Sequence, residues 1–239
     1  MKILLIALAL LFSTVASAAE YADIITKGES LIEKRQFEAA LALADSAIEL
    51  DPAGYRGYVI RGMAKEALKQ DVEACEAWDT VISLKPEYAE AYLRKGMLLM
   101  DAQDVDSLDP ALGCLNKAIE LAPKSPRVYL ARSMFRAKFK DWTGAIKDIN
   151  TAIRLNPKEA FPYYCLATAK EGLGDFTGAI NACNTGLAIK KDGYGYYVRG
   201  AIKYYSMKDK KGAIADLSLA GELGYAGAYA VLSEIQSGR

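Results

Sequence analysis

Apolar residues recur along this chain with the spacing of an α-helix, and prolines interrupt the pattern at regular distances. The stretch Trp142–Pro157, WTGAIKDINTAIRLNP, shows it most clearly. Ala145, Ile149 and Ala152 follow one another at steps of four and three, so they share one face of a helix. Pro157 ends that helix, because the residue before a proline is pushed out of helical geometry. The pattern predicts one amphipathic helix with a defined end.

Variants of this stretch occur five more times along the chain. The aligned small residues of the copies are separated by 34, 37, 34, 34 and 34 positions. They are Ala40, Ala74, Ala111, Ala145, Ala179 and Ala213. A second helical pattern precedes each copy and has a small residue of its own, in order Gly28, Gly62, Gly96, Ser133, Ala167 and Gly200. Because a bulky residue at such positions would overpack two adjacent helices, the repeat predicts a series of tightly packed helical hairpins.

A 34-residue period with a small residue in the first helix, Ala-x3-apolar in the second and a closing proline resembles the tetratricopeptide repeat family. The resemblance covers Tyr21 to Tyr225. It implies an all-α fold, a right-handed superhelical solenoid of antiparallel helix-turn-helix repeats whose stacked neighbours bury the apolar faces. The turn at 220–225 is similar to that of the related Sel-like repeats. The expected repeats are 21–54, 55–88, 89–125, 126–159, 160–192 and 193–225, followed by a capping helix at 226–237.

Two of the repeats have a longer turn between their helices. In the third repeat the turn DAQDVDSLDP is three residues longer, and Asp109-Pro110 is typical of a helix N-cap followed by a first-turn proline. The four aspartates of this turn, Asp101, Asp104, Asp106 and Asp109, raise the question of calcium, but the glycine and the terminal glutamate of a calcium loop are missing. We therefore expect a solvated acidic loop. In the sixth repeat the turn SMKDKKG is one residue longer and basic.

The first residues have the features of a secretory signal peptide. Lys2 precedes the apolar run Ile3–Phe12, which is too short to span a bilayer, and Ala16-Ser17-Ala18 matches the small-residue cleavage pattern. The sequence predicts a signal peptide at 1–18 and an exported protein that is periplasmic or extracellular. An uncleaved anchor or a buried first helix is the alternative. No second apolar run is long enough for a membrane helix, so the processed chain is not expected to span a membrane.

Composition argues against most catalytic functions. The chain contains 30 Lys and Arg, 30 Asp and Glu, and no histidine. Without histidine the commonest general base and metal ligand are missing, and no Ser/His/Asp or Cys/His arrangement can form. No GxxxxGK[ST] or GxGxxG motif occurs, and a nucleic-acid binder would show a basic excess. We expect no enzymatic activity, no cofactor, no metal site and no nucleic-acid partner.

The cysteines are Cys75, Cys114, Cys165 and Cys183, and they show no metal-ligand spacing. Each lies in a predicted helix among apolar neighbours, which favours buried thiols. Cys165 and Cys183 fall in one helical hairpin, so an oxidising compartment would also allow a disulfide between them. The sequence leaves that pairing open.

Charged residues recur at fixed places in two of the hairpins. Arg132 and Arg199 precede the small residue of a first helix, and Asp148 and Asp216 lie three residues after the aligned alanine of a second helix. In an antiparallel hairpin these positions face each other, which predicts the ion pairs Arg132–Asp148 and Arg199–Asp216. We interpret both pairs as structural rather than as a charged functional site.

The family resemblance implies that the first helices line a concave groove that holds a partner. Residues at i, i+4 and i+7 of each first helix share one face, and many of them are methionines or tyrosines. Methionine repacks readily around varied apolar partners, and tyrosine adds apolar area with a hydrogen-bonding end. Packing between repeats is the alternative role. The candidate groove residues are Met63, Leu93, Met97, Met100, Leu130, Met134, Phe161, Tyr164, Tyr194, Tyr197 and Tyr204.

The best-known peptide site of the family, a clamp for a C-terminal carboxylate, is not expected here. At the matching positions, Ile25, Val59 and Leu93 stand where lysine would be needed, and Met63 and Met97 stand where asparagine would be needed. The resemblance therefore argues against specific carboxylate capture and against binding to cytosolic chaperones.

The sequence favours a non-enzymatic scaffold or adaptor of the cell envelope, which binds a peptide or protein segment in the concave groove. One alternative is a self-assembling structural or envelope-assembly component whose main partner is another copy or an envelope complex, so a homo-oligomer stays open. A further alternative is an enzyme-associated accessory subunit.

Overall fold

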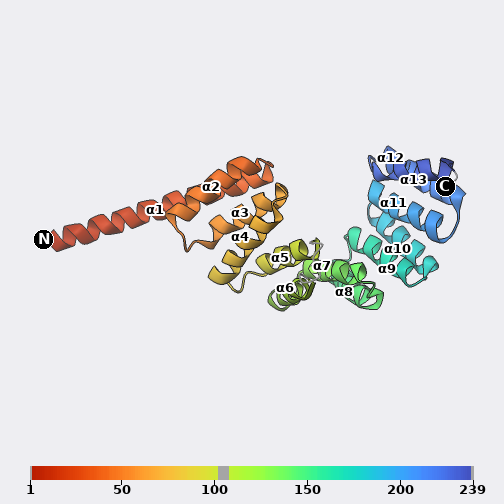
Figure 1. Ribbon diagram of the computed structural model, residues 1–239, viewed down its shortest axis with the longest axis horizontal. Coiled ribbons are helices and arrows are strands. Elements are labelled where there is room, and N and C mark those ends of the chain that lie inside the picture. The colour runs from red at the N-terminus through yellow and green to blue at the C-terminus, as the bar shows by residue number, and fades with distance from the viewer. Residues whose placement is uncertain (1, 102–107, 238–239) are drawn as a thin grey trace. The chain divides into compact units, whose positions relative to one another are not determined.

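A computed structural model describes residues 2–101 and 108–237 of the chain. Within those residues all regular secondary structure is helical, which confirms the predicted all-α class. The chain divides into two compact units, Met1–Leu121 and Ala122–Arg239 (called unit 1 and unit 2 below). The two units are described separately, and Figure 1 shows the helices of each.

Unit 1 consists of three helical hairpins. Its helices are α1 Lys2–Glu33, α2 Phe37–Leu50, α3 Tyr55–Ala67, α4 Asp71–Leu84, α5 Ala89–Asp101 and α6 Leu108–Leu121. The pairs α1 with α2, α3 with α4 and α5 with α6 make the most extensive contacts. Because short turns join the two helices of the first two pairs, these helices run antiparallel.

Unit 2 repeats the same arrangement and adds a terminal helix. Its helices are α7 Pro126–Lys138, α8 Trp142–Leu155, α9 Phe161–Gly172, α10 Phe176–Ile189, α11 Gly193–Ala201 with its continuation η2 Ile202–Ser206, α12 Lys210–Glu222 and α13 Gly227–Ser237. The first helices of successive hairpins also touch, α7 with α9 and α9 with α11. Helix α13 packs on α12 and α11 at the end of the unit.

The aligned small residues form the centre of each hairpin, as the repeat predicts. Their side chains are fully buried at Ala40, Ala74, Ala111, Ala145, Ala179 and Ala213. The close approach of the first helix is visible at Gly62, where an added Cβ would lie 2.7 Å from Cε2 of Trp78. Each core cluster spans consecutive helices, and one joins Leu130 of α7, Ile149 of α8 and Ala169 of α9. The stacking of neighbouring hairpins therefore buries the apolar faces that a single hairpin would leave exposed.

The turns inside the hairpins share one backbone conformation. One residue of each described turn adopts a left-handed conformation with φ between 59° and 80°, namely Arg35, Lys69, Lys140, Gly174 and Lys208. In three turns the next residue is an aspartate whose carboxylate caps the second helix by accepting a hydrogen bond from the backbone N–H three residues on. At the first of these caps, Asp141, an added Cβ at Gly144 would lie 2.1 Å from a carboxylate oxygen, so any other residue there would displace the cap.

The extra residue of the sixth repeat does not lengthen its turn, contrary to the sequence-based expectation. The turn is Met207–Asp209, as short as the turn 139–141 of the fourth repeat. The additional residue lies in the π-helical segment Ile202–Ser206, which widens the end of the first helix. We attribute this to the turn itself, because its left-handed residue and its aspartate cap require a fixed number of residues.

The start of α6 also differs from the expectation. Asp109 lies in the first turn of α6 rather than at its N-cap, because the helix already begins at Leu108. Pro110 is tolerated one residue later, since the N–H groups of a first turn have no partner inside the helix. Asp104 and Asp106, considered above for calcium, fall outside the described residues.

At the N-terminus, α1 runs without a break from Lys2 to Glu33, and its first part projects past α2 (Figure 1). The helix is therefore continuous through the predicted cleavage position after Ala18, and cleavage there stays a prediction. In the part of the chain that the structure describes, no helix combines the length and the apolar character needed to cross a membrane.

Candidate functional site

The structure divides the predicted groove residues into two groups. Five of them are buried with 9% exposure or less, and the clusters that contain three of the five include residues of the second helices: Leu93, Met100, Leu130, Tyr164 and Tyr204. Of the others, Met97, Met134 and Phe161 are 37–40% exposed, while Met63, Tyr194 and Tyr197 are half-buried. Only this second group keeps accessible side chains.

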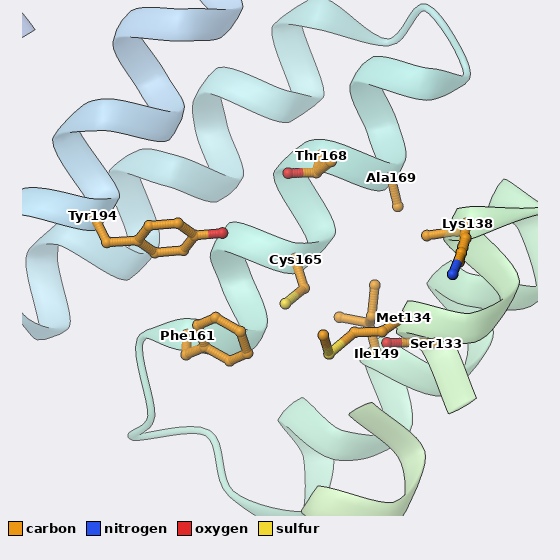
Figure 2. Close-up of a pocket in the computed structure, with 10 residues that line it drawn as sticks. Ser133, Met134, Lys138, Ile149, Phe161, Cys165, Thr168, Ala169 and Tyr194 are labelled. Atoms are coloured by element: carbon orange, nitrogen blue, oxygen red, sulfur yellow. The ribbon is translucent and has the colours of Figure 1, made fainter. Parts of the chain in front are cut away.

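Three of the accessible residues converge on one pocket in unit 2. Met134, Phe161 and Tyr194 come from α7, α9 and α11, the first helices of three consecutive hairpins. The pocket has a volume of about 320 Å³. Its lining residues are Ser133, Met134, Ala137, Lys138, Ile149, Phe161, Cys165, Thr168, Ala169 and Tyr194. Figure 2 shows the sulfur atoms of Met134 and Cys165 facing the same space as the ring of Phe161.

The remaining accessible residues are not part of this pocket. Met63 and Met97 belong to unit 1. Tyr197 packs its ring against Tyr225 with the centroids 4.7 Å apart, so it steadies the end of unit 2. The sequence-based set thus contains one group that meets at a single site and several residues that serve packing.

Aromatic contacts fix one wall of the pocket. The Tyr194 ring lies 5.9 Å from that of Phe161 and 5.8 Å from that of the buried Tyr164, in both cases between centroids. A third contact joins Tyr194 to Tyr225 at 5.7 Å. Burial raises the pKa of Tyr194 to about 12, so its phenol stays neutral at physiological pH. This wall is a preformed, uncharged aromatic surface.

Cys165 lies on the floor of the pocket as a neutral thiol. Burial raises its pKa to about 12, and the same cause raises the pKa of Cys183 to about 12. Cys165 is half-buried and Cys183 is buried, and a protonated cysteine in such surroundings behaves as a small apolar group. Each cysteine is free in the described part of the chain, so the structure contains no bond between Cys165 and Cys183.

The polar groups around the pocket are mostly engaged within their own helices. Ser133 Oγ donates to the carbonyl of Leu130 at 2.7 Å, and Thr168 Oγ1 donates to the carbonyl of Tyr164 at 3.3 Å. Lys138 is the one charged residue among those that line the pocket. The site therefore offers an apolar surface with a single cation.

The predicted ion pairs hold the helices that shape this site. Asp148, 2% exposed, accepts hydrogen bonds from Arg132 at 2.7 and 2.9 Å and from Arg136 at 2.8 Å. The bond to Asp148 raises the pKa of Arg132. Because Arg132 and Arg136 flank Met134 along α7, the double pair fixes this part of α7 on α8. Both arginines therefore have a structural role, as the sequence analysis predicted for Arg132.

Asp216 repeats the arrangement in the last hairpin. It accepts hydrogen bonds from Arg199 at 2.6 and 2.9 Å and from Lys203 at 2.7 Å. The predicted pair Arg199–Asp216 is thereby confirmed, and the bond raises the pKa of Arg199. The second cation of each site, Arg136 or Lys203, follows the first by one helical turn and was not predicted.

Of the ten residues that line the pocket, the predicted groove set contains only Met134, Phe161 and Tyr194, so Cys165 and Lys138 are among those missed. In α9 the residues that reach the pocket are Phe161, Cys165 and Thr168. They follow the expected i, i+4, i+7 spacing but begin three residues earlier than the face chosen around Tyr164. The sequence therefore predicted the spacing of the residues that reach the pocket, but not which side of the helix faces it.

Other kinds of site find little support in the described residues. Ile25, Val59 and Leu93 are buried core residues with 9% exposure or less, so these positions hold no cations for a carboxylate clamp. A search of residues 2–101 and 108–237 finds no cluster of three or more metal-ligating side chains.

Comparisons with known proteins identify the fold. A co-chaperone of Fusarium oxysporum f. sp. lycopersici that contains tetratricopeptide repeats and a J domain is 31% identical over 103 residues. The match covers 43% of this chain and 19% of the co-chaperone, so the chain spans about a fifth of that protein's length. No family model matches the chain.

Solved structures resemble nearly the whole chain. PilW, described as a type IV pilus biogenesis factor, superposes with a TM-score of 0.78 at 16% identity, over 89% of this chain and 97% of PilW. A tetratricopeptide repeat protein from Parabacteroides merdae superposes with a TM-score of 0.71 at 20% identity, over 90% and 82% of the two chains. The chain therefore has the tetratricopeptide repeat fold.

Proposed function

We propose that this protein is a non-enzymatic interaction scaffold that holds a segment of another protein in the pocket between α7, α9 and α11. The convergence of Met134, Phe161 and Tyr194 on one apolar pocket carries the proposal. A concave apolar surface on a rigid helical array is a common way to bind peptides. The neutral Cys165 and Tyr194 make the pocket suitable for an apolar side chain rather than for catalysis.

The comparisons support a binding role without naming the partner. One related protein is described as a co-chaperone and another as a pilus biogenesis factor. The chain has no histidine and no nucleotide-binding motif, which agrees with a scaffold that carries out no reaction. We place this scaffold in the cell envelope or outside the cell, on the evidence of the signal-peptide pattern at 1–18.

A capture experiment tests the role of the pocket. The chain is immobilised and partners are taken from an envelope extract, with Met134→Glu compared against Leu219→Glu. Both side chains are 40% exposed, but Leu219 does not line the pocket. A carboxylate in the apolar pocket should reduce capture by about tenfold or more, because it must be desolvated when the partner binds. Equal capture by both variants would contradict the proposal.

Cleavage of the signal peptide is tested separately. We expect the protein isolated from the producing cells to begin at Ala19, because Ala16-Ser17-Ala18 matches the cleavage pattern. The intact mass of the protein in the exported fraction measures this. A chain that still starts at Met1 and remains with the membrane fraction would show that the segment is an anchor.

A further inference from the structure

The two units carry opposite net charges, although the whole chain is neutral. Residues 1–121 contain 12 Lys and Arg against 20 Asp and Glu, a net charge of −8. Residues 122–239 contain 18 against 10, a net charge of +8. The pocket lies entirely in the basic unit. A field of one sign attracts ligands of the other sign and raises their association rate.

The same bias is present in the helices that line the pocket. Together α7, α9 and α11 contain six Lys and Arg and one acidic residue, Glu171. The carboxylate of Glu171 is engaged, since it accepts a hydrogen bond from Ser206 of η2. In unit 1 the excess is smaller, because α3 and α5 contain five basic and three acidic residues. Arg132, Arg136 and Arg199 are paired with Asp148 and Asp216, so the attraction for acidic partners rests mainly on the net charge of unit 2.

The chemistry of the pocket favours an aromatic side chain. A volume of about 320 Å³ is near the lower limit for ligand sites, which is room for one large side chain. The rings of Phe161 and Tyr194 and the sulfur atoms of Met134 and Cys165 face this space. Both rings and sulfur atoms interact favourably with an aromatic ring at their edges and faces.

We propose that the pocket binds an aromatic side chain of an acidic protein segment, with the aromatic ring as the anchor and the flanking carboxylates attracted by the positive charge of unit 2. This inference rests on the proposed function and specifies its partner. It differs from carboxylate capture, because the positions of the family clamp hold apolar residues, of which Ile25, Val59 and Leu93 are buried.

A nucleic acid would be attracted by the same charge, but the contacts argue for a peptide. Arg132 and Arg136 are bound to Asp148, and Arg199 is bound to Asp216. Their guanidinium groups are thus committed to carboxylates inside the protein instead of facing phosphates. An apolar pocket with one lysine in its lining is better matched to a single anchored ring than to a phosphate backbone.

Fluorescence anisotropy with synthetic probes tests the proposal on the full-length chain. The main probe is a fluorescein-labelled peptide with one central tryptophan and Asp and Glu on both sides. Three matched probes replace the tryptophan by alanine, the acidic residues by lysine, or the acidic residues by serine. We expect the acidic tryptophan probe to bind at least about tenfold more tightly than each of the others. Its affinity should fall several-fold between about 50 and about 300 mM salt.

Two variants locate the binding. Met134→Glu and Thr168→Trp should each weaken binding of the main probe about tenfold or more, the first by charge and the second by filling the pocket from an exposed position. The control Leu219→Glu should change it less than about twofold. Circular dichroism checks that each variant is folded, and two independent variants guard against the misfolding of one.

The outcomes separate this inference from the proposed function. Equal binding of the acidic, serine and lysine probes, all lost in Met134→Glu, would overturn the charge preference and leave the pocket as a binding site. Failure of every probe would overturn this inference, and equal capture of partners in the experiment above would overturn the proposed function. Tighter binding of a single-stranded oligonucleotide than of the main probe would overturn a peptide partner. Self-association that is lost in Met134→Glu, together with no binding of any probe, would overturn the inference. It would indicate that a second copy of the chain occupies the pocket.

Discussion

At the residue scale, Asp148 is the clearest case of a side chain that holds this molecule together. It is 2% exposed and accepts hydrogen bonds from two arginines of α7. Removal of one partner from a buried ion pair leaves the other charge uncompensated, which costs much more than the pair itself contributes. An exposed pair behaves differently, because water already screens its charges.

We therefore expect Asp148→Ala to lower the free energy of unfolding by about 3–5 kcal/mol. The control is Asp45→Ala, which removes a 58% exposed partner of Arg61 and should cost at most about 1 kcal/mol. Urea denaturation of the three proteins measures both values. Similar losses in the two variants would show that the arginines around Asp148 find water when their partner is removed.

A second prediction at this scale concerns alkaline pH. Burial raises the pKa of Cys165 to about 12, above its value in an unfolded chain. Below about pH 7.5 both states keep the proton, so the contribution of Cys165 to stability is constant there. As the pH rises through about 8.5 towards 12, the unfolded chain loses its proton first, and stability falls by up to about 1.4 kcal/mol per pH unit.

Cys165→Ala should reduce this loss. Urea denaturation at about pH 8 and about pH 10.5 gives the difference in the free energy of unfolding for each protein. The variant should lose less stability between the two pH values than the natural chain does. An identical loss in both proteins would mean that Cys165 is not the group responsible.

At the scale of the elements, the turns within the hairpins are more constant than the helices they join. Five described turns place one residue in the left-handed region, and in four of them it is lysine or arginine. Glycine occupies the position only at Gly174. A side chain in this conformation costs about 1 kcal/mol, which glycine avoids. The sixth repeat keeps the same turn and places its additional residue in the π-helical segment.

A reciprocal pair of variants tests this cost. Lys140→Gly should raise the free energy of unfolding by about 0.5–1 kcal/mol, and Gly174→Lys should lower it by about 1 kcal/mol. An added Cβ at Gly174 meets no atom within 4 Å, so the expected loss comes from the backbone alone. Thermal or urea unfolding measures both changes. Changes of the same sign in the two variants would contradict the explanation.

At the scale of the whole molecule, the extensive contacts between the described helices within each unit join helices of the same hairpin or of adjacent hairpins. The contacts of α8 are with α7 and α9, and those of α2 are with α1 and α3. In such an array stability is close to a sum of local terms, so a defect in one repeat remains near its site. This property allows the pocket to be varied in unit 2 without loss of the fold of unit 1.

Hydrogen exchange tests how local the stability is. In Asp148→Ala we expect faster amide exchange in α7, α8 and α9, and unchanged exchange in α2 and α3. Mass spectrometry of peptides from the two units measures the difference. A uniform increase along the chain would show that the units unfold as one cooperative body.

The repeat period, the buried alanines and the Arg132–Asp148 and Arg199–Asp216 pairs follow from the sequence alone. The reason is that they depend on the helical period and on hairpins that join neighbours 16 or 17 residues apart. The position of the pocket depends on contacts between residues that are further apart in the sequence. Phe161 and Tyr194 lie on different hairpins, and the packing of α7, α9 and α11 determines which part of each helix stays accessible.

The tertiary structure alone therefore decided that Tyr164 is core and Cys165 is pocket, although they are adjacent in sequence. A rotation by one residue along a helix moves a side chain by about 100°, and the sequence pattern of a first helix does not resolve that angle. The same limit applies to the turn of the sixth repeat, where one extra residue fits either in the turn or in the helix. The turn keeps its left-handed residue and its aspartate cap, so the extra residue lies in the helix.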